Sequence, residues 1–156
     1  MTHSANPPIA ALADFGRMIG IPDLAFDASG YCCLLIDAIT LNLEFDPPTG
    51  RLLFYAHMGL VPEDGDAAFH AMLLEADYFC RGTNGATLGI DLATRGIVLF
   101  DDHPADDFDG PALEERIGRF IDIAEHWKRR IAGWMPLRPH ELAAQDLVGR
   151  LQATRI

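Results

Sequence analysis

The segment from Ile39 to Met58 constrains the fold more than any other part of the chain. Up to Asp46, apolar and polar residues alternate, which is typical of a β-strand that buries one face. The five residues Asp46-Pro47-Pro48-Thr49-Gly50 have the composition of a tight turn. The residues after this turn, from Arg51 to Met58, are mostly apolar and predict a second strand. Because a short turn joins strands that run in opposite directions, the segment predicts an antiparallel meander.

Three further strands are predicted on either side of this pair. The run from Tyr31 to Ile36 is apolar throughout, as in a strand that is covered on both faces. Shorter strands are predicted from Thr87 to Leu92 and from Ile97 to Asp101, because turn residues precede each of them. We expect the acidic stretch from Asp101 to Asp109 to form a solvated loop.

Amphipathic segments predict one helix near the start of the chain and a longer one near its end. Apolar residues at spacings of three and four place the first from about Ile9 to Ile19. Gly16 lies inside this helix, where it costs ~1 kcal/mol relative to alanine, so we expect another backbone to pack closely against it. The longer helix begins at Pro111 and ends before Pro136.

A helix predicted between these two has more apolar residues than one neighbour would cover. It runs from a cap at Asp64 or Asp66 to about Cys80. Leu74 and Tyr78 lie off its main apolar stripe, so the helix has a second apolar side. In so small a domain, a second copy of the chain is the simplest cover for that side. The main stripe consists of Phe69, Met72, Leu73, Ala76 and Phe79.

The predicted order is therefore α-β-β-β-α-β-β-α, an α+β fold with an antiparallel twisted sheet packed by helices, and we expect it to be homodimeric. The 156 residues suit a single domain. We assign residues 1–134 to this domain and residues 135–156 to a C-terminal tail that is weakly helical or flexible.

The composition excludes several classes of partner. A formal net charge of −11 opposes the phosphate contacts on which nucleic-acid binding depends. No apolar run approaches the ~20 residues that a membrane span needs, and the first residues lack the basic start of a secretory signal. Of the three cysteines two are adjacent, which makes them poor candidates for a disulfide. We therefore expect a cytoplasmic protein that binds neither nucleic acid nor membrane.

The polar residues form no catalytic or cofactor-binding pattern. The six histidines are scattered, and none has the spacing that places two imidazoles on one helix face. The acidic stretch fails the ligand spacing of a calcium loop, and the glycines from Gly82 to Gly89 match no phosphate-binding loop. We expect no enzymatic activity, no cofactor and no metal. A small enzyme with an apolar ligand pocket, in which Asp91 or His57 is the acid or base, remains as an alternative.

Short motifs follow one another along the chain in an order and spacing that fit one protein family. They begin with Phe15-Gly16-Arg17-Met18-Ile19-Gly20-Ile21-Pro22 and end with Ala124-Glu125-His126-Trp127. Together they resemble the class I type III secretion chaperones, the Tir-chaperone or CesT-like family, over about residues 9–134. The tail departs from the shorter members. The motifs between the two ends are Leu24, Phe26-Asp27, Gly30, the run from Cys32 to Asp37, Leu52 to Ala56, Gly59 to Pro62, Met72 to Ala76, Leu88-Gly89-Ile90-Asp91, Gly96 and Phe120.

The resemblance implies a homodimer with the second helix and the fourth strand near the two-fold axis. It also implies that the N-terminal region of one or more effector proteins wraps around the dimer in extended form and adds a strand to the sheet. In the bacterial cytoplasm such a chaperone keeps effectors soluble and export-competent and delivers them to the secretion apparatus, where a secretion-associated ATPase is a further partner. A second alternative is a regulator that binds secretion-apparatus proteins instead of effectors.

Surplus apolar residues and the family pattern together give two sets of candidate site residues. We expect both sets to lie on surfaces that a lone subunit would leave uncovered. For effector binding we predict Leu12, Phe15, Ile19, Leu24, Phe26 and Leu35. For the dimer interface we predict Met72, Leu73, Ala76, Leu88 and Ile90.

Overall fold

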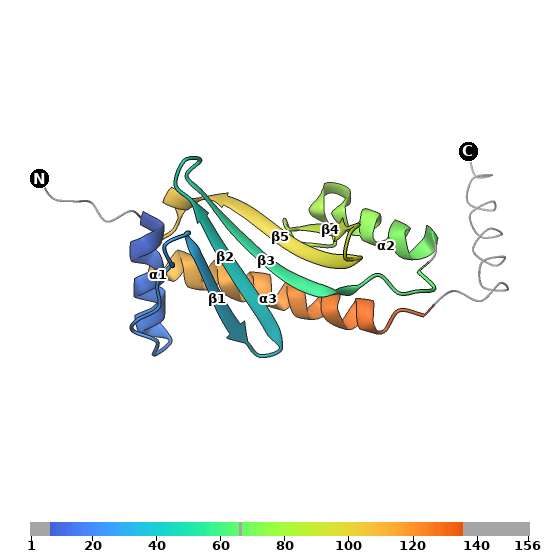
Figure 1. Ribbon diagram of the computed structural model, residues 1–156, viewed down its shortest axis with the longest axis horizontal. Helices are drawn as coiled ribbons and strands as arrows, with labels where there is room; N and C mark the ends of the chain where they lie inside the picture. Colours follow the sequence, from blue (N-terminus) through green and yellow to red (C-terminus); the bar gives the residue numbers. More distant parts are fainter. Residues whose placement is uncertain (1–6, 66, 136–156) are drawn as a thin grey trace, which may run out of the picture.

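The computed structural model describes residues 7–65 and 67–135. This part of the chain contains three α-helices and five β-strands (Figure 1). Their order confirms the predicted α+β fold; the predicted tail, apart from Met135, lies outside the described residues. The elements are α1 (Pro7–Met18), β1 (Tyr31–Ile36), β2 (Ile39–Asp46), β3 (Arg51–Leu60), α2 (Ala67–Asp77), β4 (Thr87–Asp91), β5 (Gly96–Pro104) and α3 (Gly110–Ala132), with 3-10 turns at Tyr78–Cys80 and Ala105–Asp107.

The five strands form one antiparallel sheet in the order β1-β2-β3-β5-β4. The first three strands make the meander that the alternation and the turn predict. β4 and β5 form a hairpin, and β5 pairs with β3, so that β1 and β4 are the two edge strands. Helix α2 lies in the connection between β3 and β4, next to the β4 edge (Figure 1).

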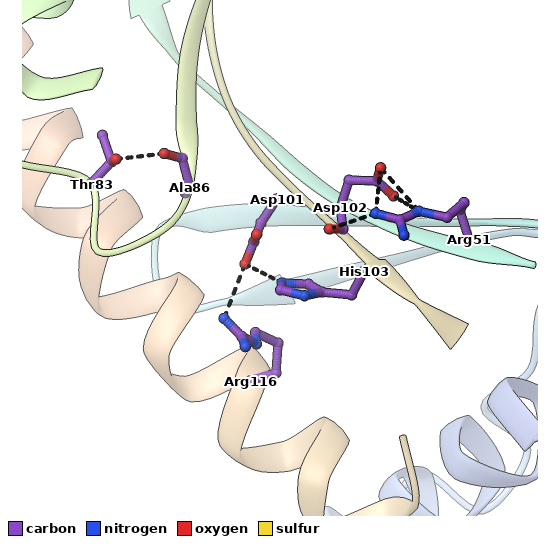
Figure 2. Close-up of polar contacts among 7 residues, drawn as sticks. All are labelled: Arg51, Thr83, Ala86, Asp101, Asp102, His103 and Arg116. Atoms are coloured by element: carbon purple, nitrogen blue, oxygen red, sulfur yellow. Dashed lines mark hydrogen bonds and ion pairs between the residues drawn. The ribbon is translucent and has the colours of Figure 1, made fainter. Parts of the chain in front are cut away.

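The core lies between one face of the sheet and the long helix α3, which runs behind β1, β2 and β3 in Figure 1. Alternate residues of β2, from Ile39 to Phe45, are buried on this face, as predicted. Near the C-terminal end of α3, Trp127 is buried, and its Nε1 donates a 3.0 Å hydrogen bond to the carbonyl oxygen of Gly82. This bond ties α3 to the loop between α2 and β4. In the same loop the buried Thr83 hydroxyl donates to the carbonyl of Ala86 and closes a turn (Figure 2).

The prediction that residues 101–109 form a solvated loop is wrong for residues 101–104, whereas Asp106, Asp107 and Asp109 are exposed in the connection between β5 and α3. β5 continues to Pro104, because it stays paired with β3 up to the pair formed by Arg51 and Pro104. Asp101 is buried in this strand, and its Oδ2 lies 3.3 Å from Nη1 of Arg116 on α3 (Figure 2). His103 Nε2 lies 2.8 Å from the same oxygen but lacks hydrogen-bonding geometry. The guanidinium therefore supplies a charged partner for this buried carboxylate.

The last acidic residue of that stretch starts α3. Asp109 has an extended backbone, and its side chain accepts a 2.8 Å hydrogen bond from the N–H of Ala112. This is the geometry of a helix N-cap, and Pro111 follows it in the first turn. The sequence placed the helix start correctly at Pro111 but left the capping residue in a loop.

Gly16 is required by a close contact between α1 and the segment after it. A Cβ atom at position 16 would lie 2.5 Å from the carbonyl oxygen of Ile21 and 2.7 Å from Cβ of Leu24. The N–H of Ile21 in turn donates a 2.7 Å hydrogen bond to the carbonyl of Gly16. The expected close approach of another backbone is confirmed.

Helix α2 ends at Asp77, before the predicted end at Cys80. Phe79 and Cys80 have φ values of 52° and 51°, in the left-handed region, so the chain leaves the helical path there. Phe79 consequently turns out of the apolar stripe in which the sequence placed it, and its side chain is 74% exposed. The prediction was wrong because a periodic pattern assumes an unbroken helix.

Candidate functional site

Most of the large apolar side chains that remain exposed belong to two groups. The first, the α1 surface, lies at the end of α1 and in the segment after it, and consists of Met18, Ile19 and Ile21, together with the half-buried Leu24. The second, the α2 surface, consists of Leu74, Tyr78 and Phe79, together with the pocket between α2 and β4 that is described below. Exposed apolar groups of this kind mark sites at which proteins bind other proteins.

Two of the predicted effector-binding residues lie in the core. Leu12 and Phe15 are 0% and 3% exposed, because α1 packs against α3 and buries the stripe that carries them. The expectation that a lone subunit exposes these two side chains is wrong. The sequence showed which side of the helix is apolar but not whether the core or a partner protein covers it.

The other four predicted effector-binding residues reach the surface, but not all at one place. Ile19 is exposed in the α1 surface, and Leu24 is half-buried against Gly16. Phe26 is also half-buried, with its ring centroid 6.1 Å from that of Phe45. Leu35 is exposed on β1 and points to the face of the sheet opposite the core, as the burial of its neighbour Leu34 shows.

A shallow pocket of about 220 Å³ separates α2 from β4. The carboxylate of Asp77, at the end of α2, accepts a 2.8 Å hydrogen bond from the backbone N–H of Leu88 on β4. Burial raises the pKa of Asp77 from its ordinary value, and the hydrogen bond from Leu88 lowers it by less. The pocket is lined by His70, Leu73, Leu74, Asp77, Leu88 and Ile90.

Two aromatic rings project where α2 ends, and one of them, Tyr78, lines a second pocket, between α2 and α3. The rings of Tyr78 and Phe79 pack edge to face with centroids 4.6 Å apart. The guanidinium carbon of Arg81 lies 5.8 Å and 5.7 Å from the two centroids, close enough for a cation–π contact with each ring. Both rings are more than half exposed, which is unusual for such large side chains in a lone subunit.

The structure brings three of the predicted dimer-interface residues together and separates the other two. Leu73, Leu88 and Ile90 line the pocket between α2 and β4. Leu73 and Leu88 are nevertheless buried, so the expectation that a lone subunit leaves these two side chains uncovered is wrong. Ala76 is buried against Gly82, where a Cβ atom would lie 2.8 Å from Cα of Ala76. Met72 faces α3, and its Sδ lies 3.2 Å from Nε of Arg130.

Leu74, Tyr78 and Phe79 were not among the predicted interface residues, although they are the most exposed side chains of the α2 surface. For Leu74 and Tyr78 the signal was present, since both lie off the main stripe of the predicted helix. Phe79 could not be found in this way, because its exposure depends on the break after Asp77.

The two candidate acid–base residues, Asp91 and His57, are both exposed. Oxygens of Asp91 accept hydrogen bonds from the N–H of Ala93 (2.9 Å) and the hydroxyl of Thr94 (2.8 Å), which closes the turn after β4. The Thr94 hydroxyl, followed by the Ala93 N–H, lowers the pKa of Asp91. His57 is exposed on β3. Within residues 7–65 and 67–135, no three His, Cys, Asp or Glu side chains gather as metal ligands.

No helix in the described ranges is long and apolar enough to span a membrane.

The edge strand β1 pairs on one side only, with β2, and so has backbone groups free to pair with a further strand.

Comparison with known proteins places this geometry in a family. Residues 10–128 match the profile of the Tir chaperone protein (CesT) family. The chain therefore belongs to this family and is a type III secretion chaperone, as the sequence motifs had indicated. None of the curated proteins compared matches the chain.

Several solved structures share the fold. The structure of the HopA1–SchA chaperone–effector complex contains a chain that is 23% identical, with a TM-score of 0.67, over 83% of this chain and 99% of that chain. The crystal structure of the ExsC–ExsE complex contains a chain that is 24% identical, with a TM-score of 0.69, over 84% of this chain and 97% of that chain. The crystal structure of the Yersinia pestis type III secretion chaperone SycH in complex with a stable fragment of YscM2 contains a chain that is 16% identical. Its TM-score is 0.61, over 77% of this chain and 98% of that chain.

Proposed function

We propose that this chaperone works as a homodimer that binds the N-terminal region of one or more effector proteins in extended form. In the bacterial cytoplasm it keeps them soluble and export-competent and delivers them to the secretion apparatus. The observation that carries the proposal is that one subunit exposes two distinct apolar surfaces, at α1 and at α2. One partner alone does not explain both.

The α2 surface suits a second copy of the chain. In a two-fold dimer the same patch faces itself, so a surface that combines a shallow pocket with a projecting ring can complement its own copy. Leu73, Leu88 and Ile90 supply the pocket, and Phe79 is the projecting ring. The aromatic and aliphatic character of these residues is typical of the buried centre of an interface.

The α1 surface and the β1 edge suit an extended polypeptide. Strand addition supplies backbone hydrogen bonds, while exposed apolar residues such as Ile19 and Leu35 select side chains. Ordering an effector segment costs on the order of 2–5 kcal/mol, which is offset by burial of ~1,000–3,000 Å². Such a complex needs no catalysis by the chaperone, and we propose that any energy for release comes from a secretion-associated ATPase.

The domain boundary near residue 134 is also a proposal. Trp134 packs edge to face on Phe69 of α2, with ring centroids 5.2 Å apart, so the chain belongs to the folded unit up to this residue. We propose that the remaining residues form a separate tail.

Co-expression with N-terminal segments of effectors secreted by the same bacterium tests the function. Ile19→Asp, on the α1 surface, is expected to abolish co-purification of the effector segment while the chaperone stays dimeric. Leu74→Asp, on the α2 surface, is the matched variant: it introduces the same carboxylate and is expected to disrupt the dimer. Effector binding that survives Ile19→Asp, or recovery of secretion-apparatus proteins in place of effectors, would contradict the assignment.

A further inference from the structure

The face of the sheet opposite α3 carries a groove that the two surfaces above do not include. We call this side the open face, because in the described part of the chain both α2 and α3 pack on the other side. Strand pairing fixes its side chains in rows. Tyr31, Glu44, Leu53 and Asp102 form one row across β1, β2, β3 and β5, and Phe100 lies in the next row.

The groove has a volume of about 550 Å³ and lies over β2, β3 and β5. Its apolar floor includes Leu53 and Phe100, which are only half-buried although the strands around them are fully paired. Its charged residues are Glu44, Asp46, Arg51 and Asp102. A groove that combines an apolar floor with charged side chains can select among the side chains of an extended peptide.

The single cation of the groove is already neutralised. Nη2 of Arg51 lies 2.9 Å from Oδ2 of Asp102, and Nε donates to the same carboxylate at 3.1 Å (Figure 2). Nη2 also donates to the carbonyl oxygen of Asp102 at 3.1 Å. Glu44 and Asp46 have no basic partner among the described residues. The groove therefore presents two unneutralised carboxylates beside its apolar floor.

Hydrogen bonds join the two rows of side chains beside the groove. The Tyr31 hydroxyl donates to Oδ1 of Asn42 at 2.6 Å, and Nδ2 of Asn42 donates to the carbonyl of Tyr55 at 3.1 Å. Asn42 is buried under these contacts although it points to the open face. The floor of the groove is thus part of a stiff sheet and not of a mobile loop.

We propose that this groove binds a segment of the effector that combines apolar and basic residues, with an apolar side chain on Leu53 and Phe100 and an arginine or lysine at Glu44 and Asp46. The inference rests on the proposed chaperone function and adds the chemical class of the segment. Glu44 and Asp46 are two residues apart in β2, or ~7 Å, which equals the distance between successive same-side residues of an extended peptide. A segment that runs along β2 therefore meets both carboxylates.

Two synthetic peptides test the groove by fluorescence anisotropy. Both are fluorescein-labelled 12-residue chains of alternating polar and leucine positions; one carries arginines at two alternate polar positions, and the other carries glutamates there. Two exposed ion pairs predict about tenfold tighter binding of the arginine peptide to the wild-type protein at low salt. The preference is expected to shrink as the salt concentration rises.

The variant Glu44→Lys/Asp46→Lys is expected to abolish or reverse this preference. Glu63→Lys/Asp64→Lys changes the net charge equally in the exposed loop after β3 and is expected to retain it. Phe100→Thr, which removes the aromatic ring but places a residue of high β-strand propensity in the strand, is expected to weaken binding of both peptides. A preference that survives the groove variant, or is lost equally in the loop variant, would show that only the overall charge of −11 acts and would overturn the inference.

Failure of the groove and failure of the chaperone function give different results. If effector segments co-purify and are lost with Ile19→Asp, while the arginine preference ignores Glu44 and Asp46, only the groove assignment falls. If no effector segment binds in any form, the proposed function itself is contradicted.

Discussion

Asp77 on α2 and Leu88 on β4 are joined by a 2.8 Å hydrogen bond from the backbone N–H of Leu88 to the carboxylate of Asp77. The bond fixes the helix on the edge strand, and it does so with a carboxylate that is partly removed from water, which raises its pKa. A carboxylate thus lies beside the apolar side chains of Leu73, Leu74 and Leu88 in the α2 surface.

The raised pKa of Asp77 predicts a variant that stabilises the fold. Since the folded protein prefers the protonated form, ionisation costs stability as the pH rises through the raised pKa. Asn can still accept the bond from Leu88 without carrying a charge. Asp77→Asn is therefore expected to be more stable than wild type at pH 7 and equally stable below pH 3.8, as measured by urea unfolding across this range.

Asp27 provides the opposite case and serves as the control. Its Oδ1 accepts hydrogen bonds from the hydroxyl of Ser29 (2.6 Å) and from the N–H groups of Ser29 (2.8 Å) and Tyr31 (3.0 Å), which lower its pKa. The stability that these hydrogen bonds give the folded protein is present above pH 3.8 and is lost as the pH falls through the lowered pKa of Asp27. Asp27→Asn is expected to destabilise at pH 7, with a difference that vanishes in acid; a difference of the same sign in both variants would contradict the account.

Two helical glycines are expected to respond to alanine with opposite signs. Gly16→Ala places a methyl group 2.5 Å from the carbonyl oxygen of Ile21 and is expected to destabilise by ~1–3 kcal/mol. Gly118, in α3, has nothing within 4 Å of such a methyl group, so Gly118→Ala is expected to stabilise by ~0.5–1 kcal/mol. Thermal unfolding measures both, and a neutral Gly16→Ala would disprove the close contact.

The ion pair between the buried Asp101 and the half-buried Arg116 gives a further prediction. Arg116→Met leaves a buried carboxylate without its guanidinium and is expected to cost ~1–3 kcal/mol. Arg119, one turn further along the same helix, pairs with Glu115 in solvent, and Arg119→Met is expected to change the free energy of unfolding by less than ~0.5 kcal/mol. Equal effects in chemical denaturation would mean that the buried position of Asp101 has no energetic consequence.

The order of elements was predictable because each signal is local. The alternation from Ile39 to Phe45, the turn at residues 46–50 and the apolar periodicity of the helices depend only on neighbouring residues. Asp101 shows where such reasoning ends: its charge suggested a loop, but the partner that permits its burial, Arg116, lies on another element. A sequence does not display pairs of this kind.

The candidate sites were predicted less well, for the same reason. An apolar stripe shows that one side of a helix will be covered, but not what covers it; Leu12 and Phe15 face α3 and therefore lie in the core. Leu74 and Tyr78 were recognisable as surplus, whereas the exposure of Phe79 depends on two left-handed residues that no periodicity reveals. The groove on the open face requires the strand register, which only the structure supplies.

The central claim is that the α2 surface is covered by a second copy of the chain. Light scattering coupled to size-exclusion chromatography of the purified, effector-free protein measures this directly. The account predicts a mass of twice 17.1 kDa for the wild type and 17.1 kDa for Leu74→Asp. A wild-type mass of 17.1 kDa at every concentration tested would contradict it.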